Sequence, residues 1–476
     1  MKIQISKRTL FLALIISLLI LPGICPVSAE EVISLEEAIR LGMENNKGIN
    51  EARDGIANLE KALEKIEIQA DWKLNLGADY TYTITDQDKA GNFGDKNKDD
   101  SSWGLRISAS KNYLSGLTLA PVIGIDEDTE TDFTLRVSKD LYPVIPTASM
   151  RNYWNTEISL NKARENLREL KINNILDWLE SYSNIKRMIS RQDIYTENLN
   201  KAESNMEKVL RRQKIGDAGR NEILAAELGL KNAEYSLKEA GNQLENALYN
   251  FASSIGFSGE KIIITDKNNF FDRLMQAASD YSEELLSRDM DELYVLIEKN
   301  NYKLRSNLLD REVMERELEW LKKENHPELS FEGMYNSSSD NLFLSLKLSY
   351  QLYDGGQHKM EIEEKEKEIK DNIDAYDELY NELKQELKQL LDRLELAEMA
   401  LERGYLSLER SRYELTVAEQ QLEMGVIDYL EYQDKWVSEA EAEIQIAVLK
   451  EQLFLDRMRF IKFLDLDLAY EIIGGF

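Results

Sequence analysis

The chain contains one pattern twice, in which a charged helix gives way to a short segment of alternating polar and apolar residues. The first copy of the helix begins at Glu44-Asn45-Asn46 and ends near Asp71, and the second begins at Lys299-Asn300-Asn301 and ends near His326. The two copies keep a constant offset of 255 positions, without a gap across the helix. A duplicated unit of helix, strand and helix predicts a tube that is part β-barrel and part coiled coil.

The alternating segments have the period of two residues that β-strands show. Four such segments occur within residues 72–142 and two within residues 327–353. One set of side chains is almost purely aliphatic or aromatic, whereas the other set carries Lys, Arg and Asp in the middle of the segment. This pattern predicts transmembrane strands around a water-filled lumen. The alternative is an amphipathic sheet of a soluble protein.

The first half of the chain has one pair of strand segments more than the second half. The additional pair comprises residues 103–112 and 117–125. Its alternation resembles that of the other segments, so the pair could enlarge a barrel or form a hairpin that stands above the membrane.

Two helices of unusual length follow the strand segments. They are predicted over residues 147–215 and 357–424, and each would span ~100 Å at 1.5 Å per residue. In the second helix, apolar residues repeat at alternating spacings of four and three, as in a coiled coil, at Leu383, Leu387, Leu390, Leu394, Ala397 and Leu401. Each helix ends at a glycine, Gly216 or Gly425, and turns back into a helix over 221–255 or 429–463.

The first 29 residues have the pattern of a secretory signal peptide. Lys2, Lys7 and Arg8 precede an apolar run, and Val27-Ser28-Ala29 is a small-residue cleavage site. Cleavage would leave Glu30 as the mature N-terminus. The alternative is a lipoprotein anchored at Cys25. The apolar run is short for a transmembrane helix, and no other stretch is apolar enough to span a bilayer as a helix, so a membrane crossing would require a closed barrel.

Composition excludes several classes of function. The net charge of −29 argues against nucleic acid as a partner, because phosphate binding requires clustered Lys and Arg. Two histidines and one cysteine are too few for a His-rich metal site or an internal disulfide. No arrangement of nucleophile and base, phosphate-binding loop or metal cluster occurs, so we expect no catalytic residues, no metal and no cofactor.

We divide the chain as follows. The signal peptide is 1–29, the first repeat 30–255, an equatorial linker of mixed character 256–290, and the second repeat 291–476, which ends in a short tail. The first repeat holds the strands of 72–142 and the hairpin of 147–255. The second holds the strands of 327–353 and the hairpin of 357–464.

Several short motifs resemble the TolC-like outer membrane efflux protein family. They are Leu35-Glu-Glu-Ala38 before Glu44-Asn45-Asn46, the stretch His326-Pro327-Glu-Leu-Ser-Phe331, and the strand-to-helix turn Leu352-Tyr-Asp354-Gly355-Gly356. No single motif is strong, but their order, spacing and duplication are specific together. The resemblance covers nearly the whole mature chain.

The resemblance implies a homotrimer in the outer membrane, with a shared barrel in the lipid and a helical tunnel in the periplasm. It implies a periplasmic adaptor protein and an inner-membrane transporter as partners. The tip turns, and with them adaptor docking, would lie at Gly216, Gly219 and Gly425. The periplasmic gate would comprise Glu222, Glu431 and Asp434, which would form rings of negative charge around the tunnel mouth. The alternative is that these acids are ordinary residues at helix starts, stabilised by the macrodipole.

This chain also departs from the family pattern. Trp72 stands where the family commonly has proline, and the first half has Leu141-Tyr-Pro143 in place of the Asp-Gly-Gly turn. Beside the gate acids, Ile427 and Leu422 stand where the best-known members have an arginine and a tyrosine. Any network that closes the gate must therefore differ.

The sequence thus predicts a passive exit channel of a tripartite efflux or type I secretion system, for drugs, small molecules or a secreted protein. One alternative is a structural tether between the outer membrane and the cell wall, which needs no lumen. The other is a periplasmic adaptor, which usually has one hairpin and lacks such strands. The cargo cannot be named from the sequence.

Overall fold

The computed structural model describes residues 31–83, 100–126, 130–257, 262–265 and 269–472, so the predicted signal peptide lies outside the described residues. The chain divides into two compact units. The hairpin unit contains residues up to Asn50, Lys171–Arg288 and the chain from Gln389 onward, and the sheet unit contains Glu51–Leu170 and Asp289–Lys388. Three helices run from one unit into the other.

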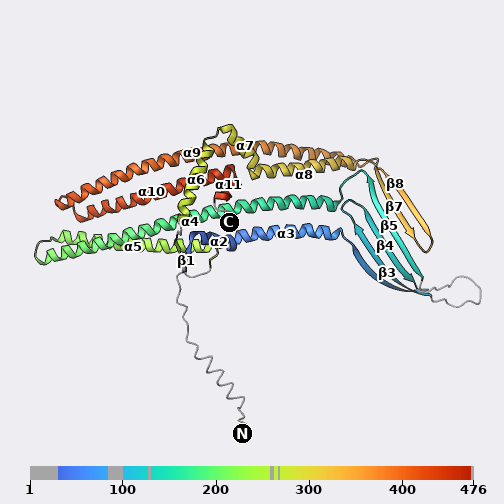
Figure 1. The fold of residues 1–476 in the computed structure, drawn as a ribbon, viewed down its shortest axis with the longest axis horizontal. Coiled ribbons are helices and arrows are strands. Elements are labelled where there is room, and N and C mark those ends of the chain that lie inside the picture. The colour runs from blue at the N-terminus through green and yellow to red at the C-terminus, as the bar shows by residue number, and fades with distance from the viewer. Residues whose placement is uncertain (1–30, 84–99, 127–129, 258–261, 266–268, 473–476) are drawn as a thin grey trace, which may run out of the picture. The chain divides into compact units, whose positions relative to one another are not determined.

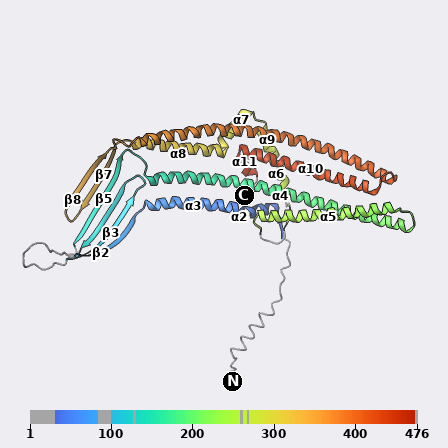
Figure 2. The ribbon, with the colours of Figure 1, turned by 180° about the vertical axis from the view of Figure 1, so that it is seen from behind.

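One antiparallel sheet dominates the sheet unit, in the order β2-β3-β4-β5-β7-β8. Its strands lie where the sequence predicts them, at β2 (Lys73–Thr83), β3 (Asp100–Asn112), β4 (Thr118–Asp126), β5 (Thr131–Tyr142), β7 (Glu328–Asn336) and β8 (Asn341–Ser349). Figures 1 and 2 show both faces of this sheet, with β8 at one edge and β2 at the other. Neither edge strand has a second partner among the described residues.

The register separates polar from apolar side chains as the alternation predicts. Leu76 lies opposite Ile107, and Leu329 lies opposite Leu348, so these residues share the apolar face. That face is open, since Leu74 is 75% exposed and Leu344 is 63% exposed. Arg106, Arg136 and Lys347 lie on the other face, which we call the polar face.

The additional strand pair is part of this sheet. β3 and β4 lie between β2 and β5, and their connecting turn lies beside the helix ends of the same unit. There Lys111 Nζ is 3.0 Å from Asp71 Oδ1, and Thr147 Oγ1 donates to the Leu114 carbonyl at 3.0 Å. The strand order agrees with the first of the two alternatives, in which the pair extends the sheet, and does not test where the pair lies relative to a membrane.

The spacing of the helices locates this pair as an insertion. The first residues of α3 (Lys47–Gln69) and α8 (Tyr302–Glu324) are 255 positions apart. Those of α5 (Arg220–Ser254) and α10 (Tyr429–Leu464) are 209 positions apart. The first half is thus longer by 46 residues. β2 corresponds to β7 at the offset of 255 positions, and β5 corresponds to β8 at the offset of 209 positions.

The helical segment before the sheet is divided in two, and its second part lies where the first copy of the repeat predicts a helix. α2 (Leu35–Asn45) precedes α3, and Asn46 between them has an extended backbone. Ser34 Oγ accepts from the Glu37 amide to cap α2, and Asn46 Oδ1 accepts from the Ile49 amide to begin α3. The second half repeats this arrangement, with Asn301 between α7 (Met290–Asn300) and α8.

The two long helices have equal lengths. α4 (Ala148–Lys214) and α9 (Gln357–Glu423) each contain 67 residues, and each begins and ends within one residue of its predicted bounds. Their return helices are α5 and α10. Among the described helices, none contains a stretch long and apolar enough to cross a membrane.

The linker of 256–290 has regular secondary structure in its described residues. It contains β6 (Ile262–Thr265), which pairs in parallel with β1 (Glu31–Ser34), and α6 (Phe270–Leu286). Phe271 of α6 packs against Tyr182 and Phe454, with ring centroids 5.6 and 5.3 Å apart. α11 (Leu466–Ile472) also contacts α6, so the predicted C-terminal tail contains a short helix.

Candidate gate at the hairpin tips

Both hairpins turn by the same backbone geometry. In the first, the Gly216 amide donates to Gln213 O and the Asp217 amide to Arg212 O. In the second, the Gly425 amide donates to Leu422 O and the Val426 amide to Gln421 O. This is the Schellman motif, which requires the positive φ of Gly216 (79°) and Gly425 (70°).

Gly219 has a different role from these two glycines. It is the N-cap of α5 with an extended backbone, φ −78°, and it provides no side-chain cap. In the second hairpin the corresponding N-cap is Asp428, whose Oδ1 accepts from the Glu431 amide at 2.9 Å. An aspartate three residues before a glutamate is a recognisable capping signal, which sequence analysis missed.

The carboxylate of Glu222 is neutralised within its own hairpin. Arg212, in the last turn of α4, forms an ion pair with Glu222 in the first turn of α5. Its Nε also donates to Asp217 Oδ2 at 3.0 Å. The pKa of the Arg212 guanidinium is raised, first by the hydrogen bond to Asp217 and then by the charge of Glu222. Sequence analysis placed Glu222 among the gate acids and did not anticipate its ion pair with Arg212.

Glu431 and Asp434 have a different environment. Both are exposed on α10, one helical turn apart. Neither side-chain carboxylate has an ion pair or hydrogen bond with another described residue. Of the three predicted gate acids, these two therefore present unneutralised charge.

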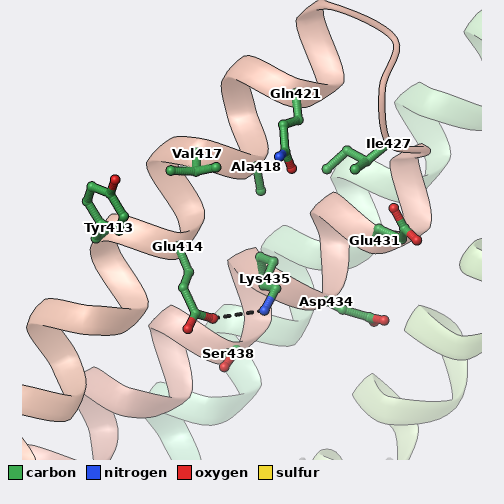
Figure 3. A pocket seen from close by; sticks show the side chains of 10 residues that line it. All are labelled: Tyr413, Glu414, Val417, Ala418, Gln421, Ile427, Glu431, Asp434, Lys435 and Ser438. Carbon is green, nitrogen blue, oxygen red and sulfur yellow. Dashed lines mark hydrogen bonds and ion pairs between the residues drawn. The ribbon is translucent and has the colours of Figure 1, made fainter.

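Figure 3 shows a groove that Glu431 and Asp434 help to line. It lies between the end of α9 and the start of α10, with a volume of about 690 Å³. Apolar and polar residues line it together: Tyr413, Glu414, Val417, Ala418, Gln421, Ile427, Glu431, Asp434, Lys435 and Ser438. Lys435 Nζ is 2.8 Å from Glu414 Oε2, and this contact, followed by the bond from Arg410, lowers the pKa of Glu414.

A second groove, of about 930 Å³, lies between the two hairpin tips and includes Arg212, Glu222 and Leu422. Tyr429 also lines it, and its buried hydroxyl has no hydrogen-bond partner among the described residues. Burial raises the pKa of Tyr429 to about 12, so the hydroxyl is neutral at physiological pH. Ile427 and Leu422 add no charge beside the gate acids. This chain therefore lacks the arginine and the tyrosine that the best-known members of the resembled family have at these two positions.

The strand-to-helix turn lies in the sheet unit, away from the gate in sequence. Gly355 and Gly356 have positive φ of 76° and 88°. The Asp354 carboxylate accepts from the Gly356 and His358 amides, both at 2.8 Å, and these backbone bonds lower its pKa. Asp354 therefore caps α9. Among the described residues, no group of His, Cys, Asp and Glu could hold a metal ion.

Polar contacts join α4 to α10 along the hairpin unit, and we call them the α4–α10 seam. Asn198 Oδ1 accepts from Gln433 Nε2 at 2.7 Å, and both residues are buried. Further contacts join Arg191 and Tyr195 to Glu441, and Ser183 to Glu451. Sequence analysis missed this seam, because its partners are more than 230 residues apart.

Glu451 gives the seam a dependence on pH. Burial raises the pKa of Glu451. The hydrogen bond from Ser183 and the charge of Arg187 act in the opposite direction and only partly offset this effect. In the folded state the carboxyl holds its proton to higher pH than in the unfolded chain. Between the unfolded value of 4.5 and the raised folded value, stability therefore falls as pH rises.

We expect Glu451→Gln to melt at a higher temperature than the unaltered protein at pH 7, because the amide avoids the cost of a buried charge. The difference should vanish near pH 4, where the glutamate is protonated in both states. Glu207→Gln is the control, since Glu207 forms an exposed ion pair with Arg211 on α4. A lower melting temperature for Glu451→Gln at pH 7 would show that the ion pair with Arg187 outweighs burial.

Comparison with known proteins supports the predicted resemblance. Residues 293–460 match the model of the family described as outer membrane efflux protein. No curated protein sequence is significantly similar to the chain.

Solved structures are similar over nearly the whole chain. A structure of CusC is 12% identical, covers 91% of this chain and 92% of its own, and superposes with a TM-score of 0.63. The CmeC outer membrane channel of Campylobacter jejuni is 11% identical, with coverages of 93% and 86% and a TM-score of 0.61. The outer membrane protein VceC of Vibrio cholerae is 12% identical, with coverages of 93% and 96% and a TM-score of 0.59.

At such low identity these structures show the fold, and the family match adds the sequence relationship. The resemblance predicted from the sequence is therefore confirmed: residues 293–460 match the family model of outer membrane efflux proteins, and the chain shares its fold with outer membrane channels.

Proposed function

We propose that this chain is one protomer of a trimeric exit channel in the outer membrane, which serves an efflux or type I secretion system without chemical turnover. The observation that carries the proposal is the six-stranded sheet, with its open apolar face and two edge strands that have no second partner in the described parts of the chain. An apolar face of this size favours lipid as its surroundings. Unpaired edges favour closure by further copies of the chain.

The number of strands supports a trimer. Six strands are too few to close a barrel with a conducting lumen. Three protomers would give about eighteen, the size of a barrel that encloses an aqueous channel. The inserted β3–β4 pair would thus enlarge the barrel.

The long helices support a tunnel that extends from the barrel into the periplasm. A helix of 67 residues is ~100 Å long at 1.5 Å per residue. The proposed gate lies at the tips of the hairpins, together with Gly216, Gly219 and Gly425. There a periplasmic adaptor would dock and join the channel to an inner-membrane transporter that supplies the energy. We propose the duplication of the chain as the origin of the two matching halves.

Two measurements on protein purified from membranes test this function. Native mass spectrometry in mild detergent should give a trimer, and planar-bilayer recording should give discrete conducting channels. A stable monomer would contradict the assembly. Trimers that insert but do not conduct would instead favour a structural tether between membrane and cell wall.

The gate makes a separate prediction. The double substitution Glu431→Gln with Asp434→Asn should weaken block by trivalent cations roughly tenfold, equivalent to about 1.4 kcal/mol. The reason is that two exposed, unneutralised charges per protomer would be lost from the mouth, while side-chain shape is kept. Single-channel recording is the measurement.

Glu364→Gln provides the matched control, because it removes an exposed acid near the other end of α9. It should leave block unchanged. If the double variant is blocked as strongly as the unaltered channel, Glu431 and Asp434 are ordinary helix-start residues and the gate lies elsewhere.

A further inference from the structure

Arg106 occupies an unusual place on the polar face of the sheet. It lies mid-strand on β3, with Gly77 opposite it on β2 and Gly124 opposite it on β4. A Cβ atom at Gly124 would meet nothing within 4 Å, and one at Gly77 would meet only the Arg106 carbonyl, at 4.0 Å. The two cross-strand neighbours thus leave the space on both sides of Arg106 open.

The guanidinium of Arg106 is also unneutralised. It is exposed, and it forms no ion pair or hydrogen bond with the described residues. Two acids lie diagonally across from it in register, Asp79 on β2 and Asp126 on β4, each opposite Gly104, and the Asp79 carboxylate is 3.2 Å from the place of a Cβ at Gly104. Arg136, by contrast, pairs with Glu332 at 3.5 Å on the same face.

We propose that Arg106 is a specificity-determining residue of the channel lumen, which draws in anionic solutes that carry carboxylate or phosphate groups. The inference rests on the proposed trimeric channel, in which the polar face lines the lumen. Arg106 belongs to the inserted strand pair, so the insertion both enlarges the barrel and supplies this charge. Three copies would form a ring of unpaired guanidinium groups.

The chemistry of the side chain fits this class of solute. A guanidinium remains charged at every physiological pH and can donate two parallel hydrogen bonds to a carboxylate or phosphate. The flanking glycines allow a solute to approach it from either side along the sheet. A ring of one sign of charge raises the local concentration of the opposite ion.

The effect of Arg106 on ion preference should depend on ionic strength. A charge on the wall of a wide lumen acts over one Debye length, which is about 30 Å at 0.01 M salt and about 3 Å at 1 M. The effect of Arg106 on ion preference should therefore be strong in dilute salt and absent in concentrated salt.

The experiment compares full-length variants in planar bilayers under a KCl gradient near 0.01 M. Arg106→Ala should raise the permeability ratio of K⁺ to Cl⁻ about twofold and weaken block by citrate, whereas Arg106→Lys should retain the unaltered ratio. At 1 M salt all variants should agree. The combined Arg136→Ala and Glu332→Ala substitutions remove a neutral pair and should change nothing.

Lys139→Ala is the control for the face of the sheet. Lys139 lies opposite Phe331 on the apolar face, so its loss removes the same charge from the other side. An equal shift for Lys139→Ala, or none for Arg106→Ala in a channel that conducts normally, overturns this inference alone. If the unaltered protein forms no channel, the proposed function fails and the inference fails with it.

Discussion

The Leu344→Arg substitution is expected to destabilise the inserted channel by about 2–4 kcal/mol per protomer. Leu344 lies mid-strand on β8, is 63% exposed on the apolar face, and is paired with Gly333 of β7. In the proposed trimer it contacts lipid near the middle of the membrane, where an arginine loses its hydration. We expect the yield of detergent-resistant trimer to fall and unfolding in liposomes to occur at lower denaturant concentration.

Ser345→Arg is the matched control, because the next residue along β8 points to the opposite face. There an arginine would stay in water, and stability should change by less than about 0.5 kcal/mol. If both substitutions cost the same, the two faces of the sheet have the same surroundings, and the assignment of one face to lipid is wrong.

Strand positions and the ends of the long helices were predictable because their signals are local. Alternation with a period of two is visible within a single strand such as β8, and it assigns each side chain to a face without knowledge of the partner. Gly216 and Gly425 end α4 and α9 through bonds that reach back only three to five residues. Both ends were therefore predicted to within one residue.

Short strands and the break between α2 and α3 escaped prediction for an equally physical reason. β1 and β6 have four residues each, too few for alternation to show, and they pair across more than 200 positions. At Asn46, which interrupts a helical pattern, the side-chain Nδ2 donates to the Ser254 carbonyl, a contact that only the tertiary fold provides. Local propensity cannot show such a bond.

The candidate gate likewise combines features that local sequence shows with features that only the tertiary fold provides. The spacing of Glu431 and Asp434 on one helical face was visible in the sequence. The sequence did not show that Glu222 pairs with Arg212, since ten residues and a turn separate them. It also could not show the bond between Asn198 and Gln433, which depends on the packing of two separate hairpins. Charge content was thus predictable, whereas charge neutralisation was not.

The second large expected effect is a loss of stability when the aromatic packing of α6, in the linker, is removed. Phe271→Ala should lower the stability of the protein by about 3–5 kcal/mol, because the ring is 1% exposed and packs edge-on against Tyr182 of α4 and Phe454 of α10. Its loss leaves a cavity where three helices meet, and these helices have little freedom to close it. Chemical unfolding in detergent, followed by tryptophan fluorescence, measures the change.

Tyr281→Ala on the same helix is the control for this prediction. Tyr281 is 40% exposed, so truncation there removes an aromatic ring without creating a buried cavity, and the cost should stay below about 1 kcal/mol. If Phe271→Ala costs no more than Tyr281→Ala, α6 is held by its backbone and polar contacts rather than by this aromatic cluster. A cost confined to Phe271 would instead identify the linker as a structural element that holds α4 and α10 together, a role that its mixed sequence composition does not suggest.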